Sequence, residues 1–460
     1  MAITINTTPL YFAPAYRPVN FNVESDRLDA NQRDITTFAD GGGGKTQITT
    51  NAAHGYYADD IILNEGTTDG YYDGSFTVTD IVDVTNYKIL KTFVAKAGAG
   101  TTTRTNINFQ IRADVIDGSA NTIGSIRQKD VSGTFDFDVA NYLRTVLEHY
   151  FYLPFGLTDI TYDSKTIENY TVKFTEEFDD LDGLLFEGDD DTSSGKKVLN
   201  ATLQHLETQT LTAFELLNGQ TRRFLTNSPE KKIRVDEEEQ VGFFISNQGG
   251  MDDIRLKYQT YDLNGNANGW NEKAIKDFST NKRGIVGVNS ELGISSSVSK
   301  LEIKIYDETH GADISETKVF IIDHLCYNSP VRVHFLNRLG AFDSFTFTGY
   351  KKEIIKSKKV LFEKGLALSF NIEDRGSTVL GIKAYQVFQV FSQYLNYTTL
   401  QWLSELLTSP EVYIQQTISG TKKIIPIIVS NKSDVIADDS GMVKIKLIYA
   451  MANELIIQNN

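Results

Sequence analysis

Residues 331–353 read VRVHFLNRLGAFDSFTFTGYKKE, two alternating runs separated by a short break. Apolar and polar residues alternate on both sides of a short break, which is the pattern of two strands joined by a turn. The candidate motif residues are the four in the break and an aspartate that follows: Asn337, Arg338, Leu339, Gly340 and Asp343. The residues alone predict a β-hairpin in which Arg338 and Asp343 pair locally and hold the turn.

Composition favours sheets over helices. The chain has 460 residues, which is too long for one core, so we expect roughly two to four domains. It has only 8 prolines, and 22 tyrosines and 27 phenylalanines supply enough apolar surface for a core in each domain. We therefore predict a mainly β protein with several sandwich-like or barrel-like domains, a few short helices and an α+β C-terminal region.

Strand alternation indicates one domain inserted into another. Alternating residues near Phe21 resume near residue 107 after a long interruption, and glycine-rich stretches at 41–44 and 96–100 have the composition of flexible joints. The predicted domains are an N-terminal β-rich domain with a helix near 138–151 (1–36 plus 105–228), an inserted β module (37–104), a central β-sandwich completed by the motif hairpin (229–350), and a C-terminal α+β domain (351–460).

Two helices have recognisable start signals. Asp138 is a good N-cap, and the apolar residues that follow it recur at helical spacing. Near the C-terminus, Thr398 and Gln401 have the spacing of a capping box, and leucines from 400 to 407 form the buried stripe. Pro410 ends this second helix.

Charge and cysteine content exclude several classes of protein. The net charge of −15 argues against a nucleic-acid-binding surface, which needs basic patches that displace counterions from phosphates. Such a charge suits an assembly subunit, or a surface past which DNA slides without sticking. Cys326 is the only cysteine, so an intrachain disulfide and a thiolate zinc site are excluded. We find neither a signal peptide nor a membrane span, and we expect synthesis in a reducing cytoplasm and no membrane contact.

The motif residues also resemble those of a known group of proteins. The pattern Asn-Arg-Leu-Gly-x-x-Asp-x-Phe-x-Phe is similar to one in virion proteins of tailed phages that infect Bacteroidota, the crAss-like phages among them. The stretches PAYRPVNF (14–21), FLTN (224–227) and LLTSPEVY (406–413) resemble the same proteins in the same order. The resemblance reaches both ends and most of the core but leaves out residues 37–104. Ala341 departs mildly from the pattern, which concerns turn geometry only.

The resemblance implies a structural virion protein, a ring, collar or tail-barrel subunit below the portal. Copies would close head to tail into a homo-oligomeric ring of roughly six or twelve, because that geometry encloses a channel. The expected partners are other neck, tail and portal proteins, with DNA passing by without specific binding. The expected location is the virion tail or neck after synthesis in the host bacterium, and residues 37–104 would project outward.

Two other functions remain open. A tail-associated protein that binds host glycans would need exposed aromatic residues beside polar ones, and the candidates for this contact surface are Tyr56, Tyr57, Tyr71 and Tyr72. The acidic residues at 176–191 could seat calcium or supply the two carboxylates of an enzyme that cleaves glycans. The segment lacks the ligand spacing of a calcium loop, and such a run is usually a solvated loop.

The remaining chemical motifs are incomplete. The run Gly43-Gly44-Lys45-Thr46 invites a phosphate-loop interpretation, but Ala39 stands where the loop needs its first glycine, and a strand-like segment follows. His324, Cys326 and His334 come closest to a metal set, without an evident fourth ligand. We therefore expect no cofactor, no metal site and no catalytic residues, and hence a protein that is not an enzyme.

Overall fold

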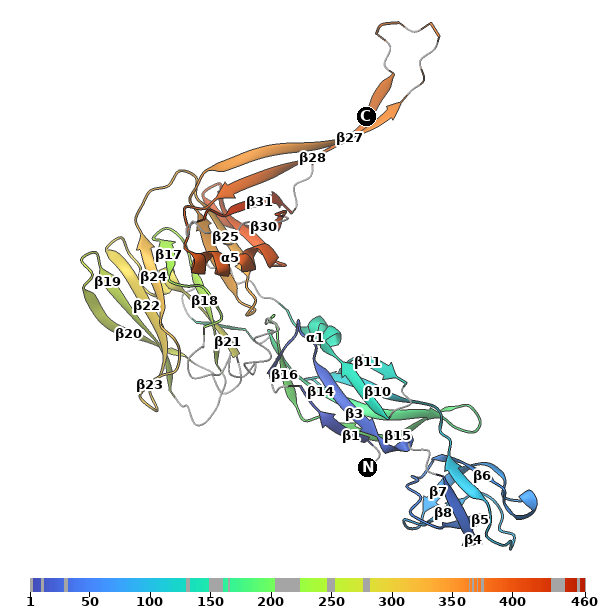
Figure 1. Ribbon diagram of the computed structural model, residues 1–460. Helices are drawn as coiled ribbons and strands as arrows, with labels where there is room; N and C mark the ends of the chain where they lie inside the picture. The colour runs from blue at the N-terminus through green and yellow to red at the C-terminus, as the bar shows by residue number, and fades with distance from the viewer. Residues whose placement is uncertain are drawn as a thin grey trace. The chain divides into compact units, whose positions relative to one another are not determined.

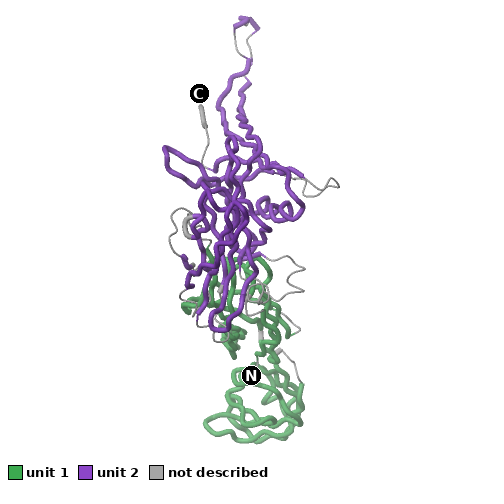
Figure 2. Tube along the Cα trace, turned by 90° about the vertical axis from the view of Figure 1, so that its left-hand side faces the viewer, with its two compact units in different colours: residues 1–148, 167–200 green, residues 149–166, 201–460 purple. Residues whose placement is uncertain are grey.

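The structure is a computed structural model that describes residues 3–9, 12–28, 32–129, 133–148, 160–163, 166–202, 224–245, 253–275, 282–363, 365, 368–369, 371–373, 376–431, 443–452 and 456–459. The chain divides into two compact units, each described here by itself (Figure 2): unit 1 is Met1–Glu148 with Ile167–Asn200, and unit 2 is His149–Thr166 with Ala201–Asn460. Both consist mainly of strands with a few short helices, which confirms the predicted mainly β class.

Unit 1 contains a sandwich-like pair of sheets. The smaller sheet has the order β1 (Ile3–Thr7), β3 (Asn20–Ser25), β12 (Thr134–Asp138). The larger has the order β11 (Thr122–Gln128), β10 (Ile107–Asp117), β14 (Ile167–Asp179), β16 (Lys196–Leu199), β2 (Phe12–Pro14), and β15 (Leu185–Thr192) also pairs with β14. Aromatic residues from both sheets form one core: Phe21, Phe109, Phe135, Phe137, Phe174 and Phe178.

The helix predicted near 138–151 is present but shorter. It is α1 (Ala140–Val146), and Leu147 is already extended. Asp138 is the last residue of β12, and its carboxylate accepts hydrogen bonds from the backbone N–H groups of Ala140 (3.0 Å) and Val19 (2.9 Å). The N-cap is Val139, without a side-chain cap hydrogen bond, so the prediction of Asp138 as the N-cap is wrong by one residue; the Asp138 carboxylate instead ties the helix start to the residue before β3. Residues 149–151 lie outside the described residues.

The predicted insertion is a closed six-stranded barrel within unit 1. Its strands follow the order β4 (Arg33–Gly42), β5 (Lys45–Thr50), β8 (Asn86–Ile89), β7 (Gly74–Ile81), β6 (Ile61–Glu65), β9 (Thr101–Arg104). Two 3-10 helices accompany it, η1 (Asp26–Leu28) before the barrel and η2 (Thr68–Gly70) within it. The barrel begins at Arg33, four residues before the predicted boundary, because β4 pairs with β9 from that residue on.

The glycine-rich stretches are not the joints of the insertion, and that prediction is wrong. Gly42, Gly43 and Gly44 have positive φ and form the tight turn between β4 and β5. Ala97 makes a bridge with Thr37 inside the barrel, and a Cβ at Gly98 would collide with the backbone of Thr36. A glycine that allows a left-handed turn or a close backbone approach leaves the same sequence signal as a glycine in a linker.

The first part of unit 2 has two further sheets. One has the order β13 (Thr161–Asp163), β21 (Lys282–Gly287), β18 (Gln240–Ile245). The other has the order β17 (Lys231–Arg234), β24 (Lys318–Asp323), β22 (Val298–Asp307), β19 (Ile254–Asp262), β20 (Ala267–Ile275), with β23 (Ala312–Asp313) pairing with β22. The short helix α4 (Val288–Glu291) follows β21, and aliphatic residues of both sheets share one core. Residues 149–166 and those from Ala201 onward belong to unit 2, although we predicted that the N-terminal domain continues to residue 228.

The motif hairpin belongs to the C-terminal sheet and does not complete the central sandwich as predicted. This sheet has the order β26 (Phe342–Phe347), β25 (Val331–Leu336), β29 (Val412–Ile418), β30 (Thr421–Val429), β31 (Lys446–Met451), β28 (Ser377–Phe391), β27 (Lys351–Glu363), and β32 (Ile456–Asn459) pairs with β28. The hairpin itself forms as predicted, with Leu336 opposite Phe342. Its second neighbour is β29, about 80 residues later, a partner that alternation alone does not specify.

One helix packs on this sheet. It is α5 (Tyr397–Thr408), and its buried residues are Leu400, Trp402, Leu403 and Leu406. The helix start differs from the predicted capping box: Asn396 is the N-cap, and its side chain accepts a hydrogen bond from the backbone N–H of Thr399 at 2.9 Å. None of the helices in the described part of the chain is long and apolar enough to span a bilayer.

β27 and β28 extend past the rest of their sheet as a long two-stranded arm (Figure 1). The pairing runs from Lys351 opposite Val390 at the base to Glu363 opposite Ser377. β31 holds only the base of β28, at residues 387–391, and β32 pairs with residues 381–384 farther along the arm. At roughly 3.3 Å per residue, 13 paired residues reach about 40 Å.

Candidate functional site

The turn of the motif hairpin is shaped by Asn337. Its side-chain oxygen accepts hydrogen bonds from the backbone N–H groups of Leu339 and Ala341, both at 3.0 Å. Its amide nitrogen donates to the carbonyl of Leu225 (2.8 Å) and to Asp343 (3.0 Å). A buried asparagine that satisfies both ends of its amide in this way fixes the turn and attaches the segment near Leu225 to it.

Asp343 is the acceptor at the centre of this region. Its Oδ2 accepts hydrogen bonds from Asn337, from the Thr226 hydroxyl at 2.9 Å and from Trp402 Nε1 at 3.0 Å. The side chain is buried. One carboxylate oxygen therefore ties the hairpin, the 224–228 segment and helix α5 together, and charge-assisted bonds of this kind are among the stronger ones.

Arg338 has different partners from those predicted. Its Nε lies 3.2 Å from Glu405 Oε1, and its backbone N–H donates to Glu405 Oε2 at 3.1 Å. Asn227 also donates to Glu405, at 3.0 Å. Burial is the main cause that raises the pKa of Glu405, and the nearby Asp343 adds to it. The predicted local pair between Arg338 and Asp343 is thus replaced by bonds from each residue to distant parts of unit 2.

Gly340 completes the turn with φ of +80°. Its carbonyl accepts a hydrogen bond from Arg283 at 2.7 Å, and Arg283 is buried. The five motif residues are therefore a structural hub of unit 2. They offer no nucleophile and no proton donor to a substrate, since their polar atoms bond to the protein itself.

A buried ion network lies on the same hairpin. Arg332 donates to Glu237 (3.0 Å), to Glu239 (2.9 Å) and to the hydroxyl of Ser344 (2.9 Å), and Lys231 lies 2.8 Å from Glu239. Burial alone would raise the pKa of Glu239, but the two cations outweigh that effect and lower it. Two carboxylates face two cations, so the network is balanced and holds β25 against the strands around residue 239.

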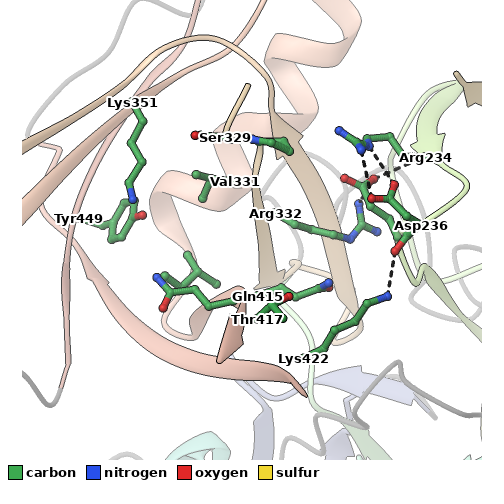
Figure 3. A pocket seen from close by; sticks show the side chains of 14 residues that line it. Arg234, Asp236, Ser329, Val331, Arg332, Lys351, Gln415, Thr417, Lys422 and Tyr449 are labelled. Atoms are coloured by element: carbon green, nitrogen blue, oxygen red, sulfur yellow. Dashed lines mark hydrogen bonds and ion pairs between the residues drawn. The ribbon is translucent and has the colours of Figure 1, made fainter. Parts of the chain in front are cut away.

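A cavity of about 380 Å³ opens beside this network (Figure 3). Arg234 is paired with Asp236 at 3.0 Å, and Lys422 donates to the backbone carbonyl of Asp236 at 2.8 Å. Lys351 and Tyr449 stand on the opposite side in Figure 3. The cations of this cavity are therefore partly used by the protein itself, and the lining offers no nucleophile with an adjacent base.

The histidine and cysteine candidates do not form a metal site. His324 Nε2 lies 2.9 Å from the carbonyl of Val298, and Cys326 is exposed. His334 is buried, and burial lowers its pKa to about 3. Among the described residues no group of three His, Cys, Asp or Glu side chains could hold a metal ion.

The four candidate tyrosines do not share one exposed face. Tyr56 and Tyr72 are buried in the barrel core, where Tyr72 stacks on Phe38 with ring centroids 4.2 Å apart. Tyr57 is half-buried, and its hydroxyl donates to Asp26 at 2.6 Å. Tyr71 is half-buried beneath the ammonium group of Lys91. A barrel this small needs large side chains to fill it, and two of the four tyrosines serve that purpose.

Charged residues that the sequence did not suggest fix the barrel to the sandwich. Arg27 lies 2.8 Å from Glu176 and 3.6 Å from Asp60, and Arg104 lies 3.1 Å from Asp60. All four side chains are almost fully buried. Burial raises the pKa of Glu176 to about 7, although Arg27 and the hydroxyl of Ser25 act in the opposite direction. An arginine at each joint of the insertion is the signal that could have revealed this anchor.

The acidic segment at 176–191 forms the β14–β15 hairpin. Glu176 and Glu177 are buried, and Glu177 pairs with Arg112 at 2.6 Å and Arg127 at 2.8 Å. The strands meet at residues 179–185, DDLDGLL, which we call the acidic turn. Its three leucines are exposed, by 44% at Leu181, 67% at Leu184 and 54% at Leu185.

The arm exposes apolar side chains along its length. Twelve of the 13 residues of β27 are exposed. Large apolar side chains reach solvent with at least half of their surface at five positions along the arm: Ile355, Val360, Leu361, Phe362 and Leu380. The two strands carry six lysines and two glutamates, a net charge of +4, on a chain whose net charge is −15. The arm therefore combines exposed apolar surface with net positive charge.

Comparison with known proteins adds little. No family model and no curated protein matches the chain. One solved structure that it is similar to is described as "Biofilm associated protein - BSP domain", with a TM-score of 0.16, 12% identity, and coverage of 82% of this chain and 72% of that one. Another is "Phage phi92 endosialidase", with a TM-score of 0.15, 8% identity, and coverage of 95% and 53%. This chain thus spans about half of the endosialidase, and TM-scores this low carry no argument.

Proposed function

We propose that this chain is a structural virion protein of a tailed bacteriophage, a ring, collar or tail-barrel subunit that multimerises around the DNA-ejection channel below the portal. The phage source rests on the resemblance of the motif residues and of three further stretches to virion proteins of crAss-like and related phages. The mainly β architecture and the exposed arm support a protein that acts by binding copies of itself and neighbouring neck, tail or portal proteins.

The arm is the observation that carries the proposal. Ordering a long strand pair costs chain entropy, and this arm buries little apolar surface to offset that cost. A partner that covers the arm would supply the missing burial. A standard interface uses about 20–30 residues from each side. The two strands of the arm contain 13 and 15 residues, which is enough to supply one side of such an interface.

The chemistry of the described residues favours assembly over catalysis. The motif residues, the Arg332 network and the Arg27 anchor all use their charges on partners within their own unit. The chain's negative charge suits a channel wall past which DNA moves without specific binding. Glycan binding has less support, because Tyr56 and Tyr72 lie in the barrel core.

Sedimentation velocity of the purified full chain tests the proposal. We expect discrete multimers at micromolar concentration. A variant in which an Asn-Gly turn replaces residues 356–385, joining the paired residues Ile355 and Gln386, should sediment as a monomer. That change also removes the pairing partner of β32, so a chain that lacks only residues 456–459 is the matched control and should still form multimers. A wild-type chain that stays monomeric throughout would refute the proposal.

A further inference from the structure

We infer that the arm docks on the acidic turn, residues 179–185, of a second copy of this chain. This inference rests on the proposed self-assembly and names the two surfaces that meet. One surface is basic and apolar and lies in unit 2, and the other is acidic and apolar and lies in unit 1. Because the two surfaces differ, the contact is head to tail, and repeated contacts of this kind close into a ring or grow into a filament.

The arm carries positive charge that its own unit does not neutralise. Lys356, Lys358 and Lys359 are exposed and have no ion-pair partner among the described residues. Lys358 also stands directly opposite Lys383 in the strand register. Like charges in opposed positions destabilise a strand pair. An anionic surface laid against this part of the arm would relieve that repulsion.

The acidic turn has the complementary composition and a fixed shape. It contains three aspartates and three exposed leucines but no lysine or arginine. Asp180 fixes the turn, because its Oδ1 accepts hydrogen bonds from the backbone N–H groups of Asp182 (3.0 Å) and Leu184 (2.7 Å). Asp182 is exposed and has no ion-pair partner among the described residues. The turn therefore presents charge and apolar surface together without having to fold on binding.

A protein partner fits the arm better than nucleic acid does. A phosphate backbone would pair with the lysines, but it offers nothing to cover Ile355, Leu361 and Phe362, which are 74%, 61% and 53% exposed. The net charge of the whole chain also opposes approach to DNA. A second copy supplies both carboxylates and leucines.

A charge-swap cycle measures the contact. Lys358→Glu alone and Asp182→Lys alone should each weaken self-association about tenfold or more in sedimentation equilibrium, because like charges then meet. The double variant should recover most of the affinity of the wild-type chain. Lys232→Glu, an exposed lysine of unit 2 outside the arm, is the matched control and should leave association unchanged. A double variant as weak as the two changes combined would overturn the inference.

Cysteine cross-linking tests whether the contact joins two chains. In a Cys326→Ser background, a Lys359→Cys chain mixed with an Asp182→Cys chain should form covalent dimers under mild oxidation. A chain with both cysteines should form a ladder of higher multimers. Asp313→Cys replaces Asp182→Cys in the control mixture and should give no dimers.

The outcomes separate this inference from the proposed function. A wild-type chain that forms multimers while the cysteine mixture stays uncoupled would overturn the docking surfaces and leave self-assembly standing. A wild-type chain that stays monomeric would overturn both. A cross-link confined within single chains, or lysine changes that weaken DNA binding and leave self-association intact, would also overturn the inference.

Discussion

Removal of the Asp343 carboxylate should destabilise unit 2 more than any other single change in the motif. Asp343→Ala leaves three donors, those of Asn337, Thr226 and Trp402, without the acceptor that they share in a buried site. An unsatisfied buried donor costs about 1–3 kcal/mol. Part of that cost is recovered where the hydroxyl or amide rotates to another acceptor, so we expect a loss of about 3–5 kcal/mol in the free energy of unfolding.

Trp402 provides the assay. The chain has two tryptophans, and Trp402 is buried whereas Trp270 is 41% exposed, so the change in emission on unfolding reports mainly on the region around α5. Urea titrations of the wild-type and Asp343→Ala chains should differ by a large shift of the unfolding midpoint, with little change in the dependence of the unfolding free energy on urea concentration. Thr226→Val keeps the shape of the side chain but removes both a donor to Asp343 and the acceptor of the Ser228 backbone N–H, so it should cost about 1–2 kcal/mol.

A double-mutant cycle makes this test decisive. In the Asp343→Ala background, Thr226→Val should cost less than it does in the wild-type chain, because the hydroxyl that it removes no longer has its acceptor and only the Ser228 backbone N–H loses a partner. Asp182→Ala, on the exposed acidic turn of unit 1, is the control and should leave the Trp402 transition unchanged. A loss below about 1 kcal/mol for Asp343→Ala would refute the role of this carboxylate as a hub.

Three further changes test the anchor and the turn. Folding raises the pKa of Glu176 from 4.5 to about 7, so between these pH values the folded chain holds a proton that the unfolded chain releases. The free energy of unfolding of unit 1 should therefore fall as pH rises from 4.5 to about 7. Glu176→Gln should flatten this pH dependence, which hydrogen exchange measures. Arg27→Ala leaves Glu176 and Asp60 buried without this cation and should cost about 3–5 kcal/mol, read as faster exchange and proteolysis of the barrel. Gly340→Ala places a Cβ on a residue with φ of +80° and should lower the free energy of unfolding by about 1–2 kcal/mol in the Trp402 assay. Gly365→Ala is the control and should change it very little, because Gly365 has no positive φ and has open space around it. Equal effects of the two substitutions would show that the backbone at Gly340 is not strained by a side chain.

Patterns local in sequence predicted the strands well. Alternation along residues 331–347 specified a hairpin, and the structure forms it in that register. The interruption between Phe21 and residue 107 specified an insertion, which is the closed barrel. These predictions succeed because a strand with one buried face alternates apolar and polar residues, and this alternation is visible in the sequence itself.

Partners far apart in sequence could not be predicted in this way. Arg338 and Asp343 are close in the chain, which suggested a local pair, but their partners Glu405 and Trp402 lie more than 50 residues away. Alternation likewise did not reveal that β25 pairs with β29. The arm was missed because lysines and aliphatic residues mix on both of its faces, a pattern that becomes meaningful only once its exposure is known.

Cryo-electron microscopy of purified phage particles that contain this chain would show where the copies lie and what they contact. We expect a closed ring of copies coaxial with the portal, with the arm of each copy lying on the acidic turn of its neighbour. A chain found as a few peripheral copies or as trimers on fibres, or one absent from the particles, would contradict it.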